Sequence, residues 1–85
     1  MEPTRATIEL DTDELLRQFW AGIQSGIIAT NGKTKMPPEV PEEEFEKAIR
    51  MAIMAAERDC QASANHAVYT EGYGYGLRYA RRRRV

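Results

Sequence analysis

The sequence predicts a mostly helical α+β domain: a short N-terminal strand, a helix, a proline-rich connector, a long second helix, and a C-terminal Tyr/Gly strand or loop with an arginine tail. Three patterns support this fold class: alternation near the N-terminus, apolar residues at a spacing of four, and clustered prolines and glycines between them. The 85 residues, 42% apolar and 29% charged, fit one small domain over residues 1–80, with a basic tail over 81–85.

The first element is a strand predicted over residues 4–10. Apolar and polar side chains alternate there, as expected of a strand with one buried face. The inward side would carry Ala6, Ile8 and Leu10, and the outward side Arg5, Thr7 and Glu9.

A helix is predicted next, over residues 13–29. Asp11 or Thr12 can cap its first turn, and Asn31-Gly32 is typical of a helix end. Its buried stripe recurs every four residues and is widened by two neighbours. The stripe consists of Leu15, Phe19, Ile23 and Ile27, with Leu16 and Trp20 beside it.

Residues 33–41 contain three prolines and predict an extended connector. Pro41 and the glutamates that follow it are a typical helix start, and no proline or glycine intervenes before residue 72, so a helix is predicted over about 42–68. A helix of about 28 residues is roughly 42 Å long. A compact chain of this size is only about 30 Å across, which favours a homodimer whose second copy covers the overhang.

The last predicted element begins at Gly72, Gly74 and Gly76, which are expected to end the long helix. Aromatic residues alternate with these glycines, so the segment is predicted as a second strand or an irregular loop. The alternating side chains are Tyr73, Tyr75, Leu77 and Tyr79.

Small residues form rows in both predicted helices, which would let two helix backbones approach closely. Two interpretations stay open: packing within one chain, or self-association of two copies. The row of the second helix is Ala48, Ala52, Ala56, Cys60 and Ala64, with Phe45, Ile49 and Ile53 as a bulky row beside it, and the first helix has Gly22 and Gly26.

Catalytic, cofactor and metal sites are not expected. The one histidine, His66, is six residues from the one cysteine, Cys60, which is not the spacing of a metal site or of a nucleophile and its base. A single cysteine forms no internal disulfide, so the cytoplasm is the predicted compartment. The longest uncharged stretch, residues 18–32, is too short and too polar to span a membrane.

Charge divides the chain into an acidic body and a basic end. Residues 1–70 carry twelve acidic and seven basic side chains (net −5), and residues 71–85 carry one acid and five arginines (net +4). Arginine side chains can bind phosphate groups, and the tyrosines beside them can stack on nucleic-acid bases. The glutamates at the start of the second helix can cap that helix or form an acidic docking surface. Nucleic acid, an acidic protein surface and no partner all stay open for the tail, which could also fold back on the acidic cluster 42–46 of its own chain or of a neighbour. The candidate partner-binding residues are Arg78, Arg81, Arg82, Arg83, Arg84, Tyr73, Tyr75, Tyr79, Glu42, Glu43 and Glu44.

The segment Arg5-Ala-Thr-Ile-Glu-Leu10, followed by Asp13-Glu-Leu-Leu16, resembles the opening of ribbon–helix–helix DNA-binding proteins. In that family a short strand pairs with its twin in a dimer, and two helices follow. The resemblance implies that Arg5, Thr7 and Glu9 would face the major groove.

These features predict a non-enzymatic, cytoplasmic interaction protein. It would bind a macromolecule, another protein first of all, and block or adapt it; phage-encoded inhibitors of host defence are small proteins of this class. The alternative is a small dimeric DNA-binding regulator that uses the N-terminal strand, the arginine tail, or both.

Overall fold

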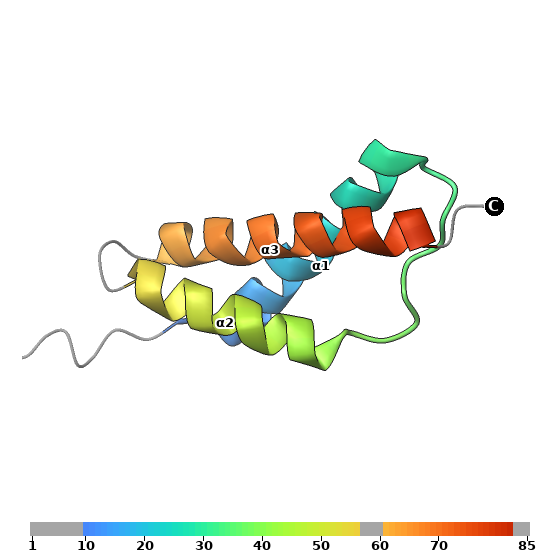
Figure 1. Cartoon of the computed structure of the whole chain (residues 1–85). Helices are drawn as coiled ribbons and strands as arrows, with labels where there is room; N and C mark the ends of the chain where they lie inside the picture. The colour runs from blue at the N-terminus through green and yellow to red at the C-terminus, as the bar shows by residue number, and fades with distance from the viewer. Residues whose placement is uncertain (1–9, 57–60, 83–85) are drawn as a thin grey trace, which may run out of the picture.

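The described part of the chain folds into three α-helices (Figure 1). The computed structural model describes residues 10–56 and 61–82, in which α1 spans Thr12–Thr30, α2 spans Glu42–Ala56 and α3 spans Gln61–Arg82. The predicted α+β class is wrong, because these described residues contain no strand. Most of the strand predicted over 4–10 lies outside the described residues. Its last residue, Leu10, is not in a strand and packs against the core.

Helix α1 agrees with its prediction at both ends. The Asp11 side chain accepts a hydrogen bond from the backbone N–H of Glu14 at 3.2 Å, which caps the first turn. Gly32 follows the helix at φ +70°, a conformation that glycine adopts without steric cost. The predicted stripe is the centre of the core: Leu15, Phe19, Ile23 and Ile27 are all buried.

The prediction of one long helix over 42–68 is wrong. Helix α2 begins after Pro41, whose carbonyl accepts the N–H of Phe45 at 2.9 Å, and it ends at Ala56. A separate helix, α3, then runs antiparallel to α2 and continues to Arg82 (Figure 1). The 15 residues of α2 span only about 22 Å. The 42 Å helix from which a homodimer was inferred therefore does not exist.

The predicted strand or loop after residue 72 is also wrong, because Gly72, Gly74 and Gly76 all lie within α3. Each glycine weakens a helix by about 1 kcal/mol relative to alanine, which is why a helix end was expected there. Tertiary packing outweighs this cost: the buried face of α3 repeats every four residues and includes two of the three glycines. That face consists of Ala64, Val68, Gly72, Gly76 and Ala80.

Helix α3 occupies the centre of the arrangement. It packs along both other helices, whereas α1 and α2 touch each other little. One contact between α1 and α2 joins the rings of Phe19 and Phe45, whose centroids are 5.2 Å apart. Helix α1 runs parallel to α3 and crosses behind it in the view of Figure 1. The connector after α1 also packs onto the helices: Pro37 is buried, and Met36 and Val40 pack against the core.

The backbones of α1 and α3 touch where glycines face each other. A Cβ atom on Gly22 would lie 2.2 Å from the carbonyl oxygen of Tyr69, and one on Gly26 would lie 2.3 Å from that of Tyr73. From the other side, a Cβ on Gly72 or Gly76 would lie 2.2 Å from a carbonyl oxygen of α1. No side chain larger than hydrogen fits these four positions while the helices keep their spacing.

Polar contacts set the register of α1 on α3. The backbone N–H of Asp11 donates to Oε1 of Gln61 at 2.8 Å, and the hydroxyls of Ser25 and Tyr69 share a hydrogen bond of 2.7 Å. The carboxylate of Glu14 accepts from Asn65 at 3.4 Å. Side-chain hydrogen bonds to Glu14 from Arg17, and then from Gln18, lower the pKa of this carboxyl, so it stays an acceptor.

The glycine contact leads to a prediction with a matched control. Replacing Gly72 by alanine places a methyl group against the α1 backbone, so we expect the free energy of unfolding to fall by about 1–3 kcal/mol or more. Replacing Gly74, whose added Cβ would meet only the Arg78 side chain at 3.6 Å, should raise it by about 0.5–1 kcal/mol. Urea unfolding followed by circular dichroism measures both. Equal effects of the two substitutions would contradict the observed contact.

Candidate functional site

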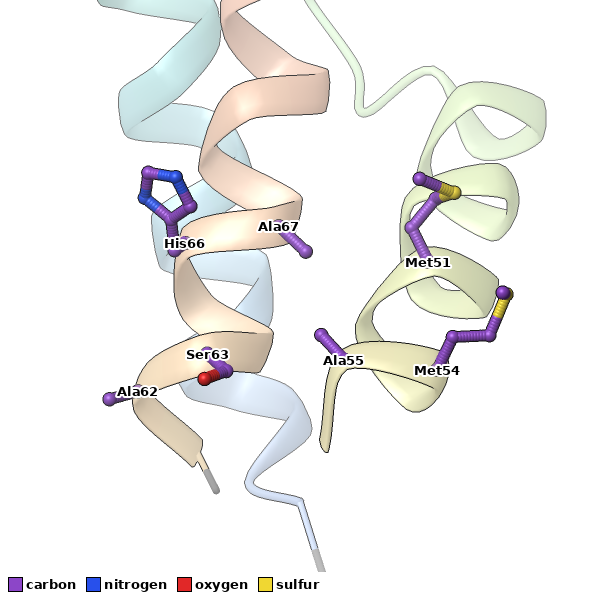
Figure 2. A pocket seen from close by; sticks show the side chains of 7 residues that line it. All are labelled: Met51, Met54, Ala55, Ala62, Ser63, His66 and Ala67. Atoms are coloured by element: carbon purple, nitrogen blue, oxygen red, sulfur yellow. The ribbon is translucent and has the colours of Figure 1, made fainter. Parts of the chain in front are cut away.

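An open groove between α2 and α3 is the first candidate site (Figure 2). A pair of antiparallel helices has two faces, and α1 covers one of them. On the other face, no described segment lies over the helices, and the side chains in Figure 2 line a depression there. Ala67 points toward α2, whereas Ala62 and His66 project on the side of α3 away from α2. The lining consists of Met51, Met54, Ala55, Ala62, Ser63, His66 and Ala67.

The lining combines exposed methionines on α2 with small side chains. Met51 is 47% exposed and Met54 66%, and Ile53 beside them is 49% exposed. Methionine is flexible and polarisable, and it is common on surfaces that adapt to partners. Ala55, Ala62 and Ala67 leave the groove shallow, so an incoming side chain or helix can reach both α2 and α3.

Sequence reasoning missed this groove. Ile53 was placed in a bulky row with Phe45 and Ile49, but only those two pack against the core. The missed signal was the width of the apolar surface on α2. Met51, Ile53 and Met54 lie outside the buried stripe of α2 and are exposed.

The second candidate site is basic and lies at the far end of α3. Arg78, Arg81 and Arg82 have exposed side chains. The guanidinium carbon of Arg78 lies 6.0 Å from the ring centre of Tyr75, which itself stacks on Tyr79 at 5.9 Å. Tyr73, the remaining tyrosine of the prediction, is 37% exposed. Arg83 and Arg84 lie outside the described residues.

The acidic cluster at the start of α2 lies beside this basic end. The carboxylate of Glu44 is 3.4 Å from the guanidinium of Arg78 and 3.7 Å from the ammonium of Lys47. Glu42 and Glu43 in the same turn are exposed. The arginine segment thus contacts the acidic cluster of its own chain through Arg78.

The small residues expected at a helix–helix contact are covered within the chain. Ala48, Ala52 and Ala64 are fully buried, as are Gly22 and Gly26 in the contact of α1 with α3. Ala56 is the last residue of α2, and Cys60 lies outside the described residues. Close packing of these rows therefore occurs inside one copy of the protein.

No cluster of three or more potential metal ligands occurs among residues 10–56 and 61–82, and His66 is exposed at the edge of the groove. None of the helices in these ranges combines the length and the apolar character needed to cross a bilayer.

Comparison with family models, curated proteins and solved structures gives no match to this chain. The outward residues of the ribbon–helix–helix resemblance, Arg5, Thr7 and Glu9, lie outside the described residues. Its DNA-binding strand therefore stays a prediction.

The contact of Glu44 with Arg78 leads to a second prediction. The pair is partly exposed, with 51% of the arginine side chain open to solvent, and exposed ion pairs contribute only about 0–1 kcal/mol. We expect Glu44→Gln and Arg78→Gln each to lower the free energy of unfolding by less than about 1 kcal/mol. A double-mutant cycle in urea isolates the pair, and a coupling energy well above that value would show that the contact is a structural clamp.

Proposed function

We propose that this protein is a non-enzymatic interaction protein whose groove between α2 and α3 binds an amphipathic helix of a partner protein. One observation carries the proposal. Large apolar side chains, Met51 and Met54, remain exposed in a groove that no other described segment of the chain covers.

The shape of the groove favours a helix as the occupant. In helix bundles, the apolar stripe of each helix is covered by the helices that pack against it. Here α1 covers one face of the α2–α3 pair. No described helix covers the other face, where one more helix could pack. Grooves of this kind take the apolar stripe of an amphipathic helix, with anchors three and four residues apart.

The composition of the groove supports a protein partner more than a small ligand. Its apolar surface is shallow and shared by two helices, and its described lining contains no carboxylate or lysine that would fix a small polar molecule. Covering a methionine that is exposed to about the extent of Met51 or Met54 gains roughly 1–2 kcal/mol. Two such anchors give a moderate binding free energy, which suits a partner that binds reversibly.

A selected peptide can test this proposal before a natural partner is known. Helical peptides selected from a library against the full chain should be amphipathic. Their binding should shift the backbone NMR signals of Ala55, Ala62 and Ala67. Met51→Gln and Met54→Gln keep side-chain length and helix propensity, and together they should weaken binding by about 30- to 700-fold because both apolar anchors are lost.

Ile28→Gln is the matched control, since Ile28 is 63% exposed but lies on α1, outside the groove lining. It should leave peptide affinity unchanged. Peptides that bind the methionine variants as tightly as the native chain would refute the groove as the binding site. A native dimer that becomes monomeric in sedimentation when Met51 and Met54 are replaced would instead identify a second copy as the occupant.

A further inference from the structure

We infer that the end of the bundle opposite the groove binds the phosphate backbone of a nucleic acid, without reading its bases. The inferred surface combines two segments that are far apart in the sequence. It consists of Lys33 and Lys35 from the connector and Arg78, Arg81 and Arg82 from the last turns of α3.

The chain topology brings these two segments to one end. Helices α1 and α3 run parallel, so the connector leaves α1 at the end where α3 finishes (Figure 1). Helix α2 is antiparallel, and the contact of Glu44 with Arg78 shows that it begins at this end too. A connector between α1 and α2 must therefore lie near the C-terminal turns of α3.

The first lysine of the connector is held by a turn. The side-chain oxygen of Asn31 accepts the backbone N–H of Lys33 at 2.8 Å and that of Thr34 at 3.1 Å. Farther along, buried Pro37 anchors the segment. Lys33 and Lys35 thus project from a backbone that is fixed at both ends, and both side chains are exposed.

Four of the five cations have no acidic partner among the described residues. No carboxylate in residues 10–56 or 61–82 lies within 4.0 Å of Lys33, Lys35, Arg81 or Arg82, and Arg78 shares Glu44 with Lys47. Cations in the last turn of a helix are favourable because of the helix dipole, which accounts for Arg81 and Arg82 alone. The helix dipole does not explain Lys33 and Lys35, because these lysines lie in the connector and not in a helix.

Phosphate is the ligand that this surface fits. Guanidinium groups bind phosphate oxygens with two parallel hydrogen bonds, and lysines add point charges along a backbone. The exposed acids at the start of α2, Glu42 and Glu43, repel a polyanion and limit the footprint to α3 and the start of the connector. Arg83 and Arg84 extend the basic run in the sequence.

Salt-dependent binding of defined oligonucleotides tests the inference. Fluorescence anisotropy of the full chain with a 20-base-pair duplex should give a linear fall of log affinity with log salt, with a slope of about −0.9 per phosphate contact and near −4 in total. A single-stranded oligo(dT) in parallel should give about −0.7 per contact. Duplexes of scrambled sequence should bind equally.

Variants identify the contacts. Arg81→Gln and Lys35→Gln should each reduce the duplex slope by about 0.9, although the two residues lie in different segments. Arg50→Gln is the charge-matched control, because Arg50 is exposed on α2 away from this end, and it should leave the slope unchanged. Circular dichroism checks that each variant is still folded.

Three outcomes would overturn the inference. The first is no binding at 50 mM salt, and the second is an equal loss with Arg50→Gln, which would indicate a net-charge effect only. The third is binding only to vesicles containing phosphatidylserine or to polyglutamate, which would assign the same cations to a membrane or to an acidic protein. None of these results depends on the groove, whose peptide test uses other residues.

Discussion

Four glycines keep the backbones of α1 and α3 in direct contact, and the positions of both candidate surfaces follow from that contact. Helix α1 lies so close to α3 that its large side chains, Leu15, Phe19 and Ile23, fill the space on one side of the α2–α3 pair. On the other side of the pair, no helix of the described residues covers α2 and α3. Because α1 and α3 run parallel, the contact also obliges the connector to start at the C-terminal end of α3, which brings its lysines to the arginines.

Helix α1 could be predicted from the sequence, cap and stripe included, because its signals are local: Asp11 before the first turn, a spacing of four, and Asn31-Gly32 after the last. The course of the chain after Pro41 could not. Residues 57–60, which join α2 to α3 in the sequence, contain no glycine or proline, whereas Gly72, Gly74 and Gly76 predict a helix end but lie within α3. Local helix propensity therefore predicts the wrong structure at both positions, because packing between segments distant in the sequence determines where the helices begin and end. The available signal was the repeated pair: Gly22 and Gly26, and Gly72 and Gly76, share a spacing of four that is typical of close helix contacts.

The candidate sites divide in the same way. The arginines were evident as a run of like charge, but Lys33 and Lys35 join them only through the parallel arrangement of α1 and α3, which no local pattern shows. The groove was missed because its residues come from two helices, α2 and α3, where the sequence predicts a single long helix. In the predicted single helix, Met51, Met54, His66 and Ala67 would be spread along the helix axis and would not line a common groove.

The two proposed surfaces are separated by the length of α3. Ser63 in the groove and Arg81 at the basic end are 18 residues apart on one helix, a distance of about 27 Å. That exceeds the Debye length of about 8 Å at physiological ionic strength, so a polyanion at one end exerts little electrostatic force on a partner helix at the other. A straight helix also transmits no obvious change of shape between them. Occupancy of one surface should then leave the affinity of the other nearly unchanged, and a chain with both activities would act as a passive link between a protein and a nucleic acid rather than as a switch.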